Sequence, residues 1–173
     1  LRAFDESGET VIVTQSFSKS LSPGLRVGYG ILPRSLVEAV HNQKGNIDFG
    51  APNFSQHVVH TVLERGLFDP HILQLRKRYR EKRDAMLAAA DKFLTPIPGA
   101  SWLRPRGGLY VWLCLPDGVD AGPRGKLFDL TLEEGAIYVP GEYCYPSEPN
   151  PVPRNRIRLS FGVQSALRIG LGI

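Results

Sequence analysis

SFSKSLSPGLRVGYG, residues 16–30, is the stretch of this 173-residue sequence that says most about its fold. It combines Lys19 with neighbouring hydroxyls, a Pro-Gly turn and an arginine. A lysine amine that loses its proton can form a Schiff base with an aldehyde, and desolvation or a nearby cation favours that loss. Ser16, Ser18 and Arg26 offer the hydroxyl and guanidinium donors that suit a phosphate. The stretch therefore predicts a site for a phosphate-bearing aldehyde held by Lys19.

A second informative segment is NRIRLSFG, residues 155–162, in which polar and apolar residues alternate. This period predicts a strand with one buried face, which places Arg156 and Arg158 together on the other face. A guanidinium there can bind a carboxylate through two hydrogen bonds. An edge strand with two solvated arginines is the alternative interpretation.

Together, the two segments resemble the fold-type-I pyridoxal-phosphate enzymes. The closest resemblance is to the class I/II aminotransferases, in the branch with 2-aminoadipate and kynurenine aminotransferases and the aminotransferase-like domain of MocR regulators. The resemblance implies that pyridoxal 5'-phosphate is the cofactor and Lys19 the catalytic lysine that forms the Schiff base. It also implies that Ser16, Ser18 and Arg26 bind the cofactor phosphate and that Arg158 binds the α-carboxylate of the substrate. The alternative interpretation of the first segment is a Ser/Lys-rich surface loop without a binding function.

Two further runs resemble the same family less specifically. RGGLYVWL, residues 106–113, reads as a glycine turn that leads into a strand, and we expect it to serve packing. VPGEYCY, residues 139–145, resembles a loop beside the substrate, so Tyr143 or Tyr145 is a candidate for the wall of the side-chain pocket. Aromatic residues in such a loop also commonly cover the edge of a core.

The order of elements predicts an α/β fold: the C-terminal part of a large aspartate-aminotransferase-like domain, followed by a small α+β domain. Residues 1–75 are assigned to the large domain and residues 88–173 to the small domain, joined by a long helix over about 71–93 with Asp69 at its N-cap. By the resemblance, the N-terminal half of the large domain, with its ring-binding residues, is missing from this sequence. The strands are predicted at 11–16, 26–32, 101–104, 109–115, 136–139 and 156–161, and the other helices at 35–43, 53–65 and 123–134.

Composition and charge bear on three possible classes of function: nucleic-acid binding, metal binding and membrane insertion. The net charge of +4 is concentrated at residues 76–83, which lie on the polar side of the predicted long helix, so this pattern does not favour nucleic-acid binding. Cys114 and Cys144 are too few for a disulfide framework and have no metal-ligand spacing. His57 and His60 could share a helix face but have no acidic or thiolate neighbours, so no metal is expected. No apolar run is long enough for a membrane span. These features predict a cytoplasmic protein with reduced thiols.

The resulting hypothesis is a pyridoxal-phosphate-dependent aminotransferase that moves an amino group between an α-amino acid and a 2-oxo acid. By the resemblance it forms a homodimer, and the isolated fragment is expected to be inactive. Two alternatives stay open: the effector domain of a MocR-type transcription regulator, and a non-catalytic fragment that serves as a scaffold. Other pyridoxal-phosphate chemistries share the lysine, and the substrate side chain is not determined by these residues.

Overall fold

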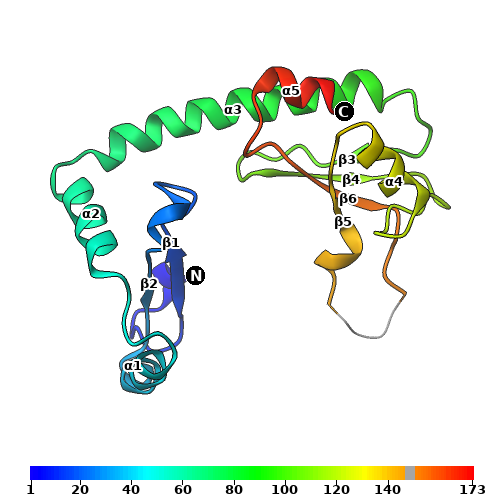
Figure 1. The fold of residues 1–173 in the computed structure, drawn as a ribbon. Helices are drawn as coiled ribbons and strands as arrows, with labels where there is room; N and C mark the ends of the chain where they lie inside the picture. Colours follow the sequence, from blue (N-terminus) through cyan, green and yellow to red (C-terminus); the bar gives the residue numbers. More distant parts are fainter. Residues whose placement is uncertain (147–150) are drawn as a thin grey trace. The chain divides into compact units, whose positions relative to one another are not determined.

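The computed structural model describes residues 1–146 and 151–173 (Figure 1). Their contacts divide the chain into two compact units, Leu1–Leu75 and Arg76–Ile173. The longest helix, α3 (Phe68–Phe93), belongs to both units, because the division falls within it.

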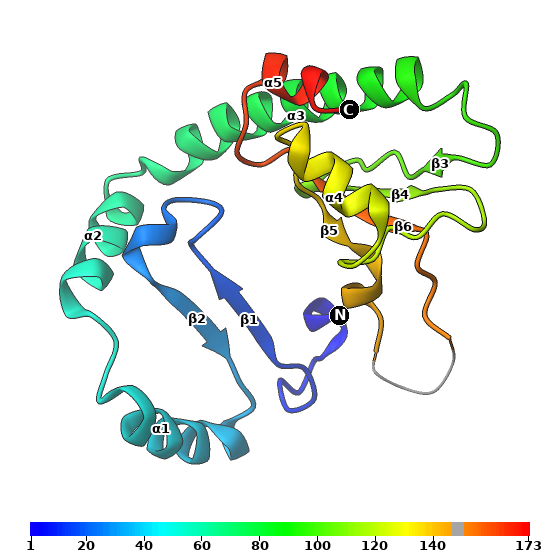
Figure 2. The same ribbon diagram turned by 45° about the vertical axis from the view of Figure 1, so that its right-hand side comes forward.

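Unit 1 is built around a two-stranded antiparallel sheet of β1 (Val13–Ser16) and β2 (Gly28–Ile31), which lie side by side in Figure 2. In their register, Val13 is opposite Ile31 and Ser16 is opposite Gly28. The other elements of the unit are the 3-10 helices η1 (Arg2–Phe4) and η2 (Pro23–Leu25), and the helices α1 (Arg34–Asp48) and α2 (Asn53–Glu64).

Few side chains are buried within unit 1. No residue of α1 is buried, and Val59 is the buried residue of α2. Several large apolar side chains of α1 and its surroundings are exposed, among them Val37, Ile47 and Phe49. Local hydrogen bonds and strand pairing therefore define much of this unit's geometry.

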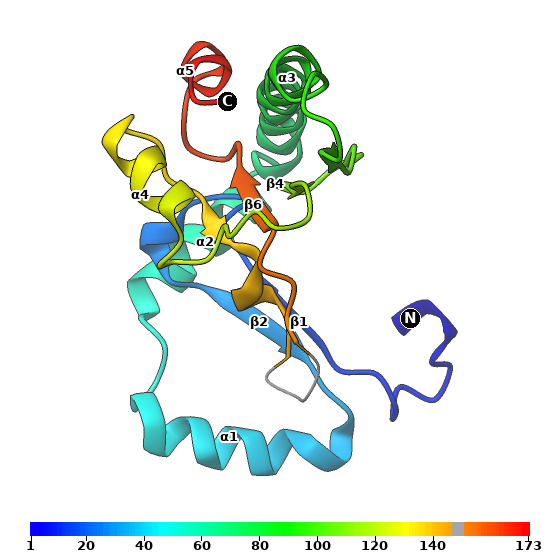
Figure 3. The ribbon, with the colours of Figure 1, turned by 90° about the vertical axis from the view of Figure 1, so that its right-hand side faces the viewer.

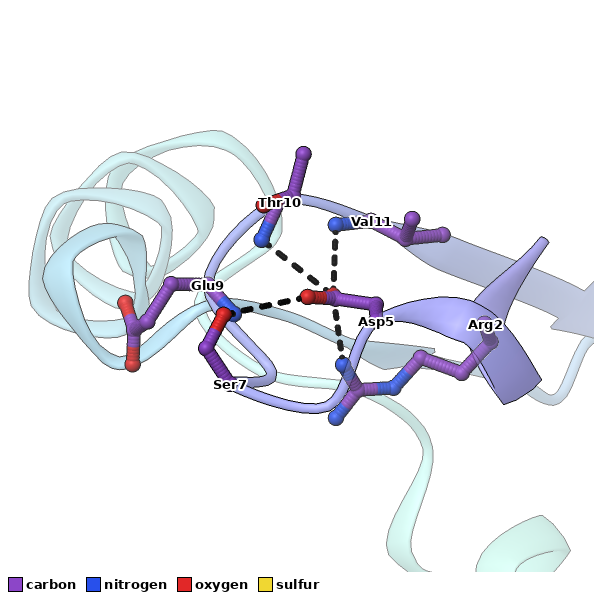
Figure 4. A network of polar contacts seen from close by, with 6 residues as sticks. All are labelled: Arg2, Asp5, Ser7, Glu9, Thr10 and Val11. Atoms are coloured by element: carbon purple, nitrogen blue, oxygen red, sulfur yellow. Dashed lines mark hydrogen bonds and ion pairs between the residues drawn. The ribbon is translucent and has the colours of Figure 1, made fainter.

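The N-terminal turn is ordered by one carboxylate, as Figure 4 shows. Asp5 accepts hydrogen bonds from the backbone N–H groups of Val11 (2.8 Å) and Thr10 (3.2 Å), and pairs with the Arg2 guanidinium at 2.7 Å. The Val11 N–H is the largest cause that lowers the pKa of Asp5 to about 2. Hydrogen bonds to the ionised form explain this direction.

Unit 2 contains a four-stranded antiparallel sheet in the order β3-β4-β6-β5. The strands are β3 (Ser101–Trp102), β4 (Tyr110–Cys114), β5 (Val139–Pro140) and β6 (Arg156–Ser160). Helices α3, α4 (Lys126–Glu133) and α5 (Ala166–Leu171) lie on one side of this sheet (Figure 3). The 3-10 helix η3 (Gly141–Cys144) follows β5 directly.

The core of unit 2 lies between these helices and one face of the sheet. Side chains of alternate residues on β4 and β6 point into it, since Val111, Leu113 and Ile157 are all buried. One cluster joins α3 and α5 to the sheet through Met86, Leu87, Val111, Phe161 and Ile169, and a second cluster contains Leu113, Leu115, Ala121, Tyr138 and Ile157. The opposite face of β4 and β6 therefore carries Tyr110, Trp112, Arg156 and Arg158.

Several element boundaries differ from the prediction. Asp69 was predicted to be the N-cap of the long helix, and this prediction is wrong. Helix α3 begins at Phe68, so Asp69 lies in its first turn. The backbone N–H of His71 already bonds to the carbonyl of Leu67. Helix α4 begins at Lys126 and not at 123, because a turn from Gly122 to Gly125 precedes it. Helix α1 is longer than the predicted 35–43.

The predicted strand over 136–139 is reduced to β5, residues 139–140. Gly135 adopts a φ of 75° after α4, and the N–H of Ala136 bonds back to the carbonyl of Thr131 at 2.8 Å. This is the hydrogen-bonded end of a helix, which keeps the following residues out of the sheet.

Candidate functional site

Lys19 lies in a turn that directly follows β1. The N–H groups of Leu21 and Ser22 both bond to the carbonyl of Phe17, at 2.8 and 3.1 Å, and the N–H of Phe17 bonds to the carbonyl of Val27 at 3.0 Å. These bonds close the loop between β1 and β2. The Lys19 side chain is exposed in the described part of the chain.

The structure brings the predicted phosphate ligands together around this turn. The hydroxyl of Ser16 donates to that of Ser18 at 2.8 Å, and the Ser16 oxygen accepts the backbone N–H of Ser18 at 3.1 Å. Nη1 of Arg26 reaches the Ser18 hydroxyl at 3.4 Å and the carbonyl of Pro23 at 3.1 Å. Three donor side chains, Ser16, Ser18 and Arg26, thus form one exposed polar cluster beside Lys19.

Arg26 holds an unusual backbone conformation. Its φ of 54° and ψ of 37° lie in the left-handed region, which residues other than glycine seldom adopt. The 3-10 helix η2 precedes it, and the Arg26 side chain turns back over that helix to Pro23. Residues with such strained backbones cluster at functional sites. Here the strained residue is the one whose guanidinium contacts Ser18 and the carbonyl of Pro23.

Gly28 allows β2 to lie close to β1 at this point. A Cβ at Gly28 would come within 2.7 Å of the Gln15 carbonyl oxygen, so a larger residue would push the strands apart. The Phe17 ring packs against Tyr29 and Phe68, with centroid separations of 5.8 and 6.0 Å. The loop that carries the polar cluster is therefore anchored on its apolar side.

In unit 2, Arg158 lies on an interior strand. It is opposite Trp112 of β4 on one side and opposite Val139 of β5 on the other. The edge-strand alternative for this segment is therefore wrong. Arg156 shares the predicted face with Arg158 and lies opposite Cys114.

The surroundings of the Arg158 guanidinium are aromatic. Its Cζ lies 4.4 Å from the centroid of the Tyr110 ring. Its Nε is buried and has no hydrogen-bond partner among residues 1–146 and 151–173. By sequence, Tyr110 and Trp112 were assigned to packing, and their position next to Arg158 was missed. The two-residue period of their strand could have indicated it, because this period puts both side chains on the same face of the sheet as Arg158.

The two candidate pocket tyrosines differ in their environment. The Tyr145 ring lies 6.1 Å from that of Trp112, so it joins the aromatic face. Tyr143 is 65% exposed. Gly141 sets the start of this loop, because a Cβ there would come within 2.7 Å of the Arg156 carbonyl carbon and oxygen. The VPG run is thus held directly against β6.

Metal-binding clusters, disulfides and membrane-spanning helices are three further features that bear on function in the described part of the chain. Residues 1–146 and 151–173 contain no cluster of three or more His, Cys, Asp or Glu side chains able to hold a metal ion. Cys114 is half-buried and Cys144 is exposed, and both are free thiols. No helix within the described ranges combines the length and apolar character that crossing a membrane requires.

Known proteins resemble this chain over nearly its whole length. The family model "Aminotransferase class I and II" matches residues 1–169. Aromatic-amino-acid aminotransferase 1 of Thermococcus litoralis is 32% identical over 173 residues, which are 100% of this chain and 39% of that protein. The uncharacterized HTH-type transcriptional regulator YisV of Bacillus subtilis is 31% identical over 173 residues, 100% of this chain and 34% of the regulator.

A solved structure gives the same result. The crystal structure of LysN, the alpha-aminoadipate aminotransferase of Thermus thermophilus, complexed with N-(5'-phosphopyridoxyl)-L-leucine, superposes with a TM-score of 0.85 at 34% identity. The match covers 96% of this chain and 41% of that one. The predicted α/β fold class is confirmed. The chain spans about two-fifths of the length of such relatives. By its family match and its fold, the chain belongs to the class I and II aminotransferases.

Proposed function

We propose that the protein is a pyridoxal-phosphate-dependent aminotransferase that moves an amino group between an α-amino acid and a 2-oxo acid. The observation that carries the proposal is the cluster of Ser16, Ser18 and Arg26 beside Lys19. The family match over residues 1–169 and the phosphopyridoxyl ligand of the Thermus relative support it.

The donor set of this cluster fits the cofactor's phosphate. Ser16 and Ser18 provide hydroxyls that can turn toward an anion, and Arg26 provides a charged fork of N–H groups. Among the described residues, the contacts of the Arg26 guanidinium are a hydroxyl and a backbone carbonyl, and no carboxylate pairs with it. Its positive charge is thus available to a phosphate.

The chain's residues are assigned the following roles. Ser16, Ser18 and Arg26 bind the phosphate, and Lys19 holds the cofactor covalently. When bound, pyridoxal phosphate supplies an electron sink that stabilises negative charge at the substrate Cα. The Lys19 amine, once free, would take the Cα proton as a general base and, as a general acid, deliver it to the former aldehyde carbon of the cofactor.

In unit 2, Arg158 is proposed to bind the α-carboxylate of the substrate. A guanidinium can bond both oxygens of a carboxylate, and it is more weakly hydrated than an ammonium group, so it loses less hydration when it binds. Tyr145, and Tyr143 with it, are proposed to contact the substrate side chain. Aromatic, 2-aminoadipate and aliphatic side chains are all within the proposal, and a cytoplasmic homodimer is its expected form.

The decisive experiment is reductive labelling of the full-length protein. The protein is incubated with pyridoxal phosphate, reduced with borohydride, digested and mapped by mass spectrometry. A pyridoxyl group on Lys19 is the expected result, and the exposed lysines Lys44 and Lys77 serve as internal controls for non-specific labelling. Label distributed equally over Lys19, Lys44 and Lys77, or absent from Lys19, would reject the proposal in favour of a scaffold.

A second candidate function is the effector domain of a transcription regulator, which the similarity to YisV over the whole chain favours. Both functions require cofactor on Lys19, so labelling does not separate them. Amino-group transfer does: the cofactor-loaded protein, not treated with borohydride, is supplied with amino acids and 2-oxo acids, and product is measured over many turnovers. Repeated turnover supports the enzyme, whereas ligand binding without turnover supports the regulator.

A further inference from the structure

The Arg158 guanidinium is held by an aromatic ring rather than by an acid. Its Cζ lies 4.4 Å from the Tyr110 ring centroid, well within the range of a cation–π contact. No Asp or Glu of the described ranges forms an ion pair with Arg158. The usual way to fix an arginine, a neighbouring carboxylate, is therefore replaced here by Tyr110.

The strand register explains how the two side chains meet. Tyr110 and Trp112 lie on the same face of β4, and Trp112 is the direct partner of Arg158 on β6. Tyr110 is thus diagonal to Arg158, a separation that long and aromatic side chains can bridge. Because β6 is paired on both sides, the backbone of Arg158 is fixed. The freedom that remains is rotation of its side chain, and the Tyr110 ring lies beside that side chain.

The burial of Arg158 Nε determines which guanidinium atoms an incoming carboxylate can reach. Nε of Arg158 is buried and makes no hydrogen bond within the described residues. A carboxylate that approaches from solvent therefore meets the terminal Nη groups. An acidic neighbour would compete with such a carboxylate for those groups, whereas a ring leaves their N–H donors unused.

We propose that Tyr110 is a positioning residue: its ring fixes the plane of the Arg158 guanidinium so that the Nη groups receive the substrate carboxylate end-on. This inference rests on the proposed aminotransferase function. An arginine side chain loses considerable conformational entropy when it is ordered, and a guanidinium ordered in advance loses less when the substrate binds. The contribution should therefore appear in substrate affinity rather than in the chemical step.

The test compares Tyr110→Leu with Tyr110→Phe in the cofactor-loaded full-length protein. Removal of the ring should raise KM for the amino acid and for the 2-oxo acid by roughly 3- to 30-fold, the range of a cation–π contact, with kcat nearly unchanged. Tyr110→Phe keeps the ring and should restore KM to within about twofold. Tyr110→Met is made in parallel, so that a folding defect of the leucine variant does not decide the result.

A double-mutant cycle with Arg158→Ala separates positioning from mere packing. If Tyr110 acts through Arg158, Tyr110→Leu should raise KM no further in the Arg158→Ala background. Equal effects of Tyr110→Leu in both backgrounds, or an unchanged KM in the folded single variants, would overturn the proposal. Failure of the proposed function itself is recognised separately, because the parent protein would then carry no cofactor on Lys19.

Discussion

Lys82 on α3 donates a hydrogen bond from its Nζ to the carbonyl oxygen of Gly162 at 3.1 Å, and a second to that of Val163 at 3.2 Å. Both carbonyls belong to the turn that follows β6. The lysine therefore ties the long helix to the end of the strand that carries Arg158, two segments far apart in sequence.

Replacement of this lysine should loosen that tie. Lys82→Met keeps the length of the side chain but removes its donors. We expect a loss of about 1–2 kcal/mol in the free energy of unfolding, near the lower end of the range for hydrogen bonds to a charged group, because Lys82 is half-buried. Urea denaturation measures it. The control is Lys77→Met on the same helix, where the side chain is exposed and no change is expected. Equal stability of the two variants would contradict the prediction.

Gly141 should not tolerate a methyl group. A Cβ would come within 2.7 Å of the Arg156 backbone, which cannot move as a flexible side chain would. We expect Gly141→Ala to lower the free energy of unfolding by roughly 1–3 kcal/mol, the range for overpacking. Gly170→Ala on α5 is the matched control: it has open space and should be neutral or stabilise by up to about 1 kcal/mol. A destabilisation common to both would show that the contact with β6 is not its cause.

Arg26→Ala should weaken cofactor binding. Loss of a charge-assisted hydrogen bond to a phosphate corresponds to a rise in Kd of about 10- to 100-fold. Backbone strain is not the cause, because alanine and arginine both carry a Cβ at the left-handed φ of this position. Equilibrium titration with pyridoxal phosphate, followed by its absorption, gives Kd. Arg34→Ala, at an exposed position on α1, should leave it unchanged.

Asp5 should make the N-terminal turn sensitive to acid. Its pKa of about 2 lies below the ordinary value of 3.8, chiefly because the ionised carboxylate accepts the Val11 N–H. The stabilisation is therefore complete above about pH 5 and is lost as the pH falls from 3.8 toward 2. Carbon-13 NMR of the Asp5 side-chain carboxyl in the folded protein should show a midpoint near the lower value. Asp5→Asn should destabilise the turn at neutral pH and have no effect below the folded pKa; a midpoint near 3.8 would refute the proposed network.

Local patterns in the sequence predicted the elements that carry the candidate residues. The alternation around Arg158 predicted its strand and its face, and the helical period predicted α3. The boundaries were less accurate, since the first turn around Asp69 and the end of α4 at Gly135 depend on hydrogen bonds that the residue pattern does not specify. The assignment of residues 1–75 and 88–173 to two domains stays a prediction, as do the roles of Lys19 and Arg158.

The sequence by itself determined the turn around Lys19, because Ser16, Ser18 and Arg26 lie close along the chain and the intervening Pro-Gly turn brings them together. The tertiary structure decided what surrounds Arg158. Alternation tells which residues share a face of one strand, but the neighbouring strand and its register follow from the packing of distant segments on a common core. Only that pairing places the ring of Tyr110 over the guanidinium of Arg158.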